Sequence, residues 1–220
     1  MWTNSKTMQP LLLVVFLLTF YACGPSAEDN DWPDHRIKAW LEYYDLHFDG
    51  FEKYHRFERP YEVTYDFNAE SDDLFAEFYV YNADSTKAID LDSYHLALEK
   101  RDDGTLYSRG REPDMEVGLI RFEENKRIRK LFCGTPCIFE EAAFDPEGRM
   151  VVAGHIENDR GYKPVLWVMS PSGTFIEQHA YLKDEERIHS AREIRYISDI
   201  RLEEVTFWHD DKAPSLDVPL

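Results

Sequence analysis

The sequence predicts a mainly β protein, in which antiparallel sheets form a sandwich or a partial barrel and one short helix lies near the N-terminus. Apolar and polar residues alternate in several short runs, as expected for strands with one buried face. Tight-turn sequences such as Asp145-Pro146-Glu147-Gly148 separate these runs. Aromatic residues make up 15% of the 220 residues, which excludes a disordered chain despite its high charge.

The helix is expected at the start of the folded part. Pro33 suits the first helical position, with Asn30 or Asp31 as the cap and Asp34 near the positive end of the dipole. An apolar stripe then follows the helical spacing i, i+3, i+4 and i+7, and Asp49-Gly50 ends the region. The residues of this stripe are Ile37, Trp40, Leu41 and Tyr44.

From Tyr61 onwards the apolar period changes to two, which predicts strands. The sequence Arg101-Asp102-Asp103-Gly104 predicts a hairpin turn, because Gly accepts a positive φ. The tail from Ile194 to Trp208 also has an extended pattern, after a helical turn at 184–191. Expected strands of the first half are 61–67, with Tyr61, Val63, Tyr65 and Phe67 on one buried face, then 74–81, 94–98, a return strand from Leu106, and 115–119.

Two hairpins are expected in the second half. Residues 138–144 lead into the turn at 145–148, and Met150 to Gly154 lead out of it; Val165 to Met169 then turn at 170–173 into Thr174 to Ile176. The stretch Phe144-Asp145-Pro146-Glu147-Gly148-Arg149-Met150-Val151-Val152-Ala153-Gly154 resembles a repeat of the β-propeller type, over about residues 139–181. A propeller needs at least four blades, so a sandwich or a partial barrel suits this length better.

The N-terminus is predicted to carry an export signal. Leu11 to Leu18 form an apolar run of signal-peptide length, and Ala22 precedes a lone Cys23. This segment resembles a bacterial lipoprotein signal peptide, although Phe20 stands where a lipobox usually has Leu and Lys6 is its one basic residue. The alternative is an uncleaved membrane anchor.

The resemblance implies that Cys23 becomes the acylated first residue of an outer-membrane lipoprotein, carrying diacylglycerol and a third acyl chain such as palmitate. The acidic stretch Ser26 to Asp31 is similar to export tags that send lipoproteins to the outer face of the outer membrane, or else it is an ordinary solvated linker. The expected organisation is a signal peptide at 1–22, a flexible tether at 23–32, one mainly β domain at 33–210 and a loose tail at 211–220.

The formal net charge of −18 restricts the partners. Nucleic acids and anionic lipid surfaces would be repelled, so we expect contact with the membrane through the lipid anchor and no binding of nucleic acid. The charge suits a partner with a cationic face, or it serves solubility alone.

The remaining cysteines, Cys133 and Cys137, form an even pair around Gly134 and Pro136. In an exported protein such a pair is expected to form a disulfide that closes a tight loop. A copper or redox site of the thioredoxin-like type is the alternative, but such sites place the pair ahead of a helix, whereas residues 138–144 favour a strand.

No catalytic motif of the common hydrolase, metalloprotease, P-loop or Rossmann types is present in the sequence. We therefore predict no catalytic residue, no metal site and no cofactor. Glu140 and Glu141 would point to opposite faces of an extended strand, as would Asp210 and Asp211, which disfavours paired-carboxylate hydrolysis. Two weaker candidates for a metal or acid–base cluster are Asp45, His47 and Asp49, with His55 nearby, and, for calcium, Asp84, Asp90 and Asp92.

These observations predict a noncatalytic, membrane-anchored lipoprotein whose β-rich domain binds a protein partner, as an accessory subunit of a cell-envelope complex or as a surface factor. The first alternative is a surface lipoprotein that binds carbohydrate through exposed aromatic residues. The second is a hydrolase with a site assembled from dispersed Asp, Glu and His residues.

Overall fold

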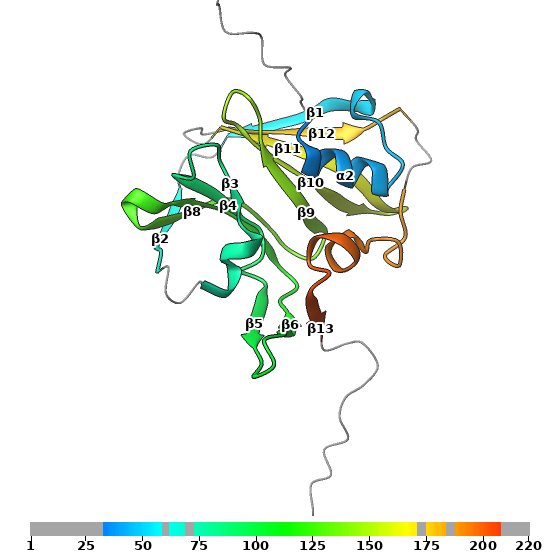
Figure 1. Cartoon of the computed structure of the whole chain (residues 1–220). Coiled ribbons are helices and arrows are strands. Elements are labelled where there is room, and N and C mark those ends of the chain that lie inside the picture. Colours follow the sequence, from blue (N-terminus) through cyan, green and yellow to red (C-terminus); the bar gives the residue numbers. More distant parts are fainter. Residues whose placement is uncertain (1–32, 59–61, 69–72, 171–174, 184–187, 208–220) are drawn as a thin grey trace, which may run out of the picture. The chain divides into compact units, whose positions relative to one another are not determined.

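The computed structural model describes residues 33–58, 62–68, 73–170, 175–183 and 188–207. The chain divides into two units, and every described residue belongs to the second, Trp32–Leu220. The predicted signal peptide, Cys23, the tether and the C-terminal tail lie outside the described residues. The prediction of a mainly β fold is confirmed: two five-stranded sheets and one three-stranded sheet account for the described strands, without a closed barrel (Figure 1).

The first five-stranded sheet has the order β1-β12-β11-β10-β9 and is antiparallel throughout. Its last four strands follow one another along the chain as a meander, over about the residues that resemble a propeller-type repeat. The strands are β1 (Phe51–Glu58), β9 (Cys137–Phe144), β10 (Met150–Asn158), β11 (Gly161–Met169) and β12 (Phe175–Tyr181).

The second five-stranded sheet has the order β2-β8-β7-β4-β3, and the small sheet has the order β13-β6-β5. All of their pairings are antiparallel except that of β13 with β6. The strands are β2 (Val63–Asp66), β3 (Val80–Tyr81), β4 (Lys87–Asp90), β5 (Leu96–Lys100), β6 (Leu106–Arg111), β7 (Met115–Arg121), β8 (Lys126–Cys133) and β13 (Val205–Phe207).

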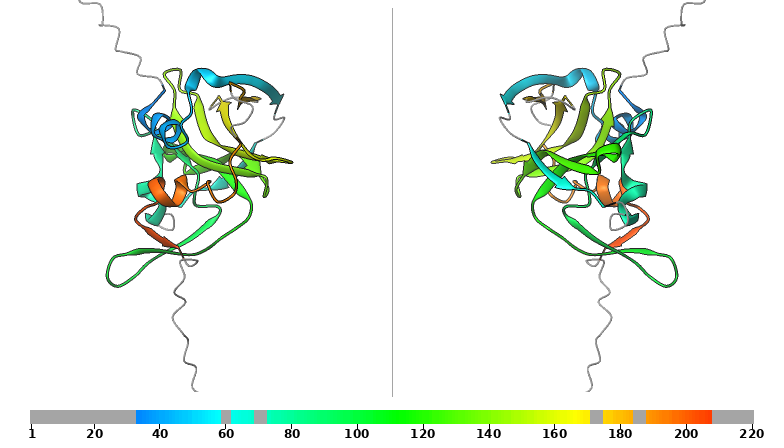
Figure 2. Two further views of the ribbon diagram at one scale, coloured as in Figure 1. Left: turned by 90° about the vertical axis from the view of Figure 1, so that its right-hand side faces the viewer. Right: turned by 90° about the vertical axis from the view of Figure 1, so that its left-hand side faces the viewer.

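One hydrophobic core joins the two large sheets. Val117 and Leu119 of β7 and Trp167 of β11 are buried in the same cluster, so the sheets pack face to face as in a sandwich. A second cluster covers the other face of the first sheet, where Ala153 and Leu166 meet residues of the helix α2 (His35–Tyr43). Figure 2 shows α2, in blue, beside the first sheet.

The helix is confirmed, but it begins later than predicted. Asp34 is the N-cap, because its carboxylate accepts a hydrogen bond from the Arg36 amide at 2.9 Å. The predicted caps Asn30 and Asp31 lie outside the described residues. The predicted apolar stripe is buried, with Ile37 and Trp40 fully inaccessible to solvent.

The predicted hairpins are confirmed where the structure describes them. Gly104 and Gly148 adopt positive φ values of 87° and 72° in the turns after β5 and β9. The Gly148 amide donates to the carbonyl of Asp145 at 2.8 Å, which closes the second turn. The turn residues 171–174 lie outside the described residues. The β5–β6 hairpin extends away from the two large sheets (Figures 1 and 2).

The strand predicted at 74–81 is wrong for most of its length. Residues Asp73–Phe78 form a 3-10 helix, and only Val80–Tyr81 are a strand. Phe75 and Phe78 are three positions apart and both pack on the core, which is the spacing of a 3-10 helix. A short apolar run serves a helix as well as a strand, so periodicity could not separate the two.

Two further strand predictions are wrong in part. β2 forms as a short edge strand with largely exposed side chains, including Tyr65. Of the face predicted to be buried, Phe67 is buried, Val63 is half-buried, and Tyr61 lies outside the described residues. The extended C-terminal segment is replaced by a π-helix, Ile197–Arg201, before the short strand β13. This turn buries Tyr196 and Ile197 against the sheets, and tertiary packing therefore overrides the local extended pattern.

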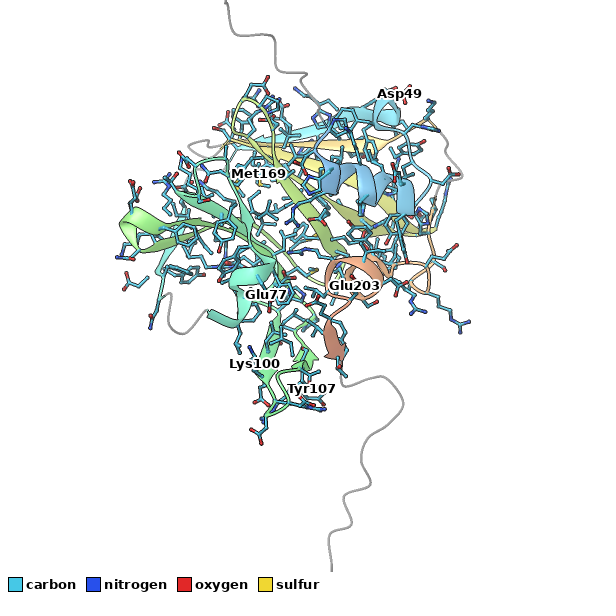
Figure 3. The ribbon with its side chains drawn as sticks, viewed as in Figure 1. Asp49, Glu77, Lys100, Tyr107, Met169 and Glu203 are labelled. Atoms are coloured by element: carbon cyan, nitrogen blue, oxygen red, sulfur yellow. A yellow bond between two sulfur atoms is a disulfide. The ribbon has the colours of Figure 1, made fainter. Side chains whose placement is uncertain are left out.

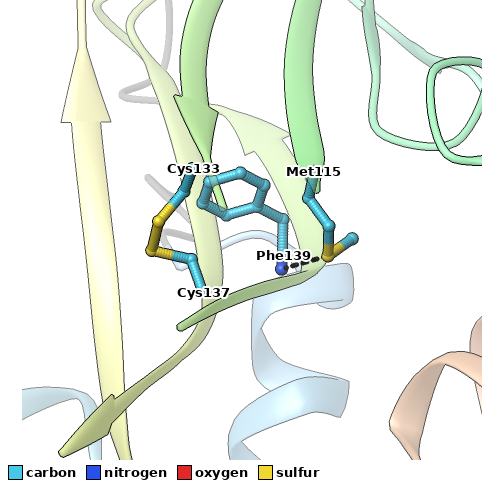
Figure 4. The surroundings of a disulfide bond; sticks show 4 residues. All are labelled: Met115, Cys133, Cys137 and Phe139. Carbon is cyan, nitrogen blue, oxygen red and sulfur yellow. Dashed lines mark hydrogen bonds between the residues drawn. A yellow bond between two sulfur atoms is a disulfide. The ribbon is translucent and has the colours of Figure 1, made fainter. Parts of the chain in front are cut away.

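The predicted cysteine pair is at disulfide-bonding distance (Figure 4). Cys133 ends β8 and Cys137 begins β9, with a Cα–Cα distance of 5.7 Å. The pair thus closes the corner at which the chain passes from the second sheet to the first. Met115 lies next to this corner, where its sulfur accepts a hydrogen bond from the Phe139 amide at 3.3 Å.

Reduction of this pair is expected to lower the free energy of unfolding by about 2 kcal/mol, the chain-entropy value for a five-residue loop. Urea unfolding of the wild-type protein, with and without dithiothreitol, measures the effect. The Cys133→Ser/Cys137→Ser double variant is the control, because its stability should not respond to dithiothreitol. Equal wild-type stability under both conditions would contradict a structural disulfide.

Candidate functional site

The carboxylates of Glu140 and Glu141 lie on the same face of the first sheet because β9 contains a β-bulge. Ala153 of β10 pairs with Glu141, but the next residue, Gly154, pairs with Phe139 and leaves Glu140 as the extra residue. The prediction that the two carboxylates point to opposite faces is therefore wrong. Gly154 permits the bulge, since a Cβ atom at this position would overlap the Ile138 carbonyl oxygen.

Glu140 is completely buried and bonded to three side chains. It accepts hydrogen bonds from the Trp40 indole at 2.8 Å and the Tyr44 hydroxyl at 2.6 Å, and its other contact is His155 Nδ1 at 2.8 Å. His155 is also completely buried, and its ring meets that of His189 at a centroid distance of 5.1 Å. Burial and the Glu140 carboxylate raise the pKa of Tyr44. This group therefore joins α2 to the first sheet through a protonated tyrosine.

Glu141 connects the bulge to the C-terminal segment. It accepts from the Tyr196 hydroxyl at 3.0 Å, and Arg201 Nε lies 3.9 Å from its carboxylate. Arg201 in turn makes an ion pair with Asp92 at 2.6 Å and donates to the Phe78 carbonyl at 3.1 Å. Burial raises the pKa of Asp92 to about 6, although the Arg201 guanidinium opposes this shift.

A second buried ionic network lies on the second sheet. Arg127 Nε contacts Asp90 at 2.7 Å, and the same guanidinium bonds to Glu116, which also accepts from Arg129. Burial opposes ionisation of Asp90, but the Arg127 charge and hydrogen bonds from Ser93 hold the pKa of Asp90 below its ordinary value. Gly118 makes room for this network, because a Cβ atom there would lie 2.7 Å from the Arg127 guanidinium carbon.

These networks have the features of structural connections. Each of these buried carboxylates is bonded to a cationic or a polar donor. The donors come from α2, from β8, from β10 and from the C-terminal segment. Removing one member of such a network strongly destabilises the folded protein, because its partner is left buried and unpaired. These networks stabilise the two large sheets from within and join α2 and the C-terminal segment to the first of them.

The most distinctive exposed feature is a group of aromatic side chains around Arg129, which we term the aromatic–arginine patch. The rings of Tyr65, Tyr94 and Phe132 have their centroids 5.4, 5.8 and 4.9 Å from the guanidinium carbon of Arg129. These three side chains are 38%, 39% and 43% exposed, respectively. The patch joins β2, β8 and the loop before β5.

The buried ionic network of the second sheet fixes the position of Arg129 in the patch. Arg129 is held by Glu116, which is fully buried, so the guanidinium is positioned before any partner arrives. Tyr94 and Phe132 meet edge to face, with a centroid distance of 5.8 Å and an interplanar angle of 88°. The patch is therefore an ordered surface whose aromatic groups lose little conformational freedom on binding.

The weaker predicted clusters do not come together. Residues Phe48–Gly50 form a 3-10 turn rather than a strand, and Asp49 is paired with Lys183 at 3.1 Å. Asp84 bonds to the Thr86 hydroxyl in an exposed turn, whereas Asp90 and Asp92 are buried against arginines. Within the described residues, no group of three or more His, Cys, Asp or Glu side chains has an arrangement suited to a metal ion.

Sequence reasoning missed the aromatic–arginine patch because its residues are distributed between positions 65 and 132. Phe132 offered one signal: it directly follows Leu131, which is buried, and successive side chains of a strand point to opposite faces. An aromatic residue that this alternation turns towards solvent indicates a surface that contacts another molecule.

The comparisons with known proteins give no relative. No protein-family model, no curated protein sequence and no solved structure matches the chain. None of the helices in the described part of the chain is long and apolar enough to span a membrane.

Proposed function

We propose that this chain is a noncatalytic, lipid-anchored protein of the bacterial outer membrane whose β domain binds a protein partner through the aromatic–arginine patch. The patch carries the proposal, because exposed tyrosine, phenylalanine and arginine side chains are the residues enriched at the centres of protein interfaces. By binding this partner, the chain acts as an accessory subunit of an envelope complex or, alternatively, as a surface factor.

The proposed compartment is supported by two separate features of the chain. Ala22-Cys23 follows an apolar run of signal-peptide length. The cysteines beyond it, Cys133 and Cys137, stand at bonding distance, and disulfides persist in exported proteins.

A protein partner is favoured over carbohydrate by the geometry of the exposed rings. Tyr94 and Phe132 are almost perpendicular, so they do not offer the single flat platform on which a sugar ring stacks. Trp40 and Trp167, the tryptophans in the described part of the chain, are both buried.

The experiment compares the proteins recovered with the full chain after mild crosslinking of intact cells. We expect an envelope protein with the wild type, a loss of most of it with Tyr94→Ala/Phe132→Ala, and full recovery with the control Tyr54→Ala on β1. Tyr54 is matched as an exposed strand aromatic, with 70% of its surface accessible. Recovery of no envelope protein would count against the proposal, and a glycan-array signal that Phe132→Ala removes would favour carbohydrate.

The proposed anchor has its own test. Cys23→Ser removes the sulfur that would carry diacylglycerol, and two or three acyl chains are what hold a lipoprotein at a membrane. We expect this variant to lose incorporation of labelled palmitate and to leave the membrane fraction after alkaline washing. Unchanged membrane retention would show instead that the apolar run at 11–18 is the anchor.

A further inference from the structure

A cleft of about 640 Å³ lies between the edges of the two large sheets. β3 and β9 are the terminal strands of their sheets, and residues of both line this cleft. The N-terminus of α2 and the turn between β9 and β10 also contribute to its lining. The lining residues used below are Asp34, Arg36, Val80, Ala83, Lys87 and Asp145.

The form of the cleft suits an extended chain. A terminal strand offers a row of backbone donors and acceptors to an added strand. The volume lies within the range of about 300–1,000 Å³ that holds small ligands, so the cleft holds a short segment and not a folded domain. Val80, Ala143 and Phe144 are apolar residues of its lining.

The acidic side chains of the cleft are already bonded within the protein to a greater extent than the basic ones. Asp34 already caps α2, and the Asp145 carboxylate accepts the Arg149 amide at 2.7 Å and its Nε at 2.6 Å. Arg36 lies 3.8 Å from Glu141, with 37% of its side chain exposed.

Lys87 also lines the cleft. The pKa of Asp84 is lowered mainly by hydrogen bonds from Thr86, and the charge of Lys87 adds only a minor part of this shift. Asp145 is thus neutralised by Arg149 and Asp34 is engaged at the start of α2, whereas both cations retain donors for a ligand.

We propose that this cleft binds a short extended peptide segment that carries an acidic side chain, with its carboxylate held by Lys87 and Arg36. The backbone of the segment adds to the edge of β3, because the Phe139 and Ala142 amides of β9 already donate to Met115 and Glu141. This inference is independent of the aromatic–arginine patch, which lies on β2 and β8.

The test uses the full chain in detergent and the labelled peptide acetyl-Thr-Val-Glu-Val-Thr-amide as the probe. We expect chemical-shift changes at 80–83 and 143–148, and binding that weakens about tenfold when Gln replaces the Glu of the peptide. Lys87→Gln and Arg36→Gln should each weaken binding of the peptide by a similar factor. Ala83→Trp, at an exposed position of the lining, should abolish binding by filling the cleft.

Two control variants establish whether the peptide binds in the cleft. Lys100→Gln removes an exposed lysine from the β5–β6 hairpin (Figure 3), which does not line the cleft, and should leave peptide affinity unchanged. Phe132→Ala should also leave it unchanged, so that failure of the patch and failure of the cleft are distinguishable. The proposal is overturned by shifts confined to other residues, by equal losses in Lys100→Gln and Lys87→Gln, or by glutarate producing the same shifts at equal concentration.

Discussion

Replacement of Arg201 by methionine is expected to lower the free energy of unfolding by about 3–5 kcal/mol, the cost of leaving a buried charge without its partner. The side chain of Arg201 is only 3% exposed and lies between Asp92 and Glu141. Its loss leaves the buried carboxylate of Asp92 without its arginine, removes one of the two arginines beside Glu141, and releases the C-terminal segment from the bulge. Urea unfolding followed by circular dichroism measures this change.

The matched control is Arg195→Met. Arg195 is also paired with an aspartate, Asp199 at 3.2 Å, but its side chain is 65% exposed. Because exposed ion pairs contribute little, we expect a change below about 1 kcal/mol. The double variant Asp92→Asn/Arg201→Met should recover part of the stability that Arg201→Met loses. Equal effects of the two single arginine variants would contradict the structural role of the buried network.

The effect of Arg201→Met should also depend on pH. Burial raises the pKa of Asp92 to about 6, well above the ordinary value of an aspartate. A carboxyl group with a raised pKa contributes stability below its unfolded pKa, and this contribution is lost as the pH rises through the folded pKa. Without Arg201 the pKa of Asp92 rises further. The destabilisation by Arg201→Met should therefore be smaller at pH 5 than at pH 8.

Gly154→Ala is expected to cost about 3 kcal/mol, at the upper end of the range for overpacking. The added Cβ atom would overlap the backbone oxygen of Ile138, and a backbone atom cannot rotate away as a side chain can. Relief requires β9 and β10 to separate at the bulge, which displaces Glu140 from Trp40 and Tyr44. Thermal and urea unfolding of the variant measure the cost.

Gly134→Ala is the control for this substitution. A Cβ atom at Gly134 would meet Asp114 Oδ1 at 3.4 Å and Pro136 Cδ at 3.8 Å, which are ordinary contacts. We expect its stability to change by less than about 0.5 kcal/mol. A Gly154→Ala variant as stable as Gly134→Ala would show that the bulge does not depend on the missing side chain.

The hairpins and the helix could be predicted because their signals are local. Gly104 and Gly148 mark turns by their conformational freedom, and the α2 stripe repeats within two turns of helix. The bulge at Glu140 could not be predicted, since it arises from the register of β9 against β10. Without the bulge the two glutamates would be assigned to opposite faces, which is the error that the sequence alone produces.

The polar networks and the patch could not be predicted from local sequence patterns either, because their members are far apart in the sequence. Arg127 and Asp90 are separated by 37 positions, and Arg201 and Asp92 by 109. Asp90 and Asp92 have oxygen atoms suited to calcium, and only their burial against arginines shows that they are ion-pair partners instead. The sequence supplies the chemistry of a side chain, whereas its distant neighbours decide how that chemistry is used.

The most direct test of the proposed function is site-specific photo-crosslinking in intact cells. A photoreactive phenylalanine analogue at position 132 reports on the aromatic–arginine patch, and the same analogue at position 54 reports on an exposed strand of the other sheet. We predict one discrete protein adduct from position 132, reduced by Tyr94→Ala, and no such adduct from position 54. The same adducts from both positions, or none from position 132, would contradict a partner-binding patch.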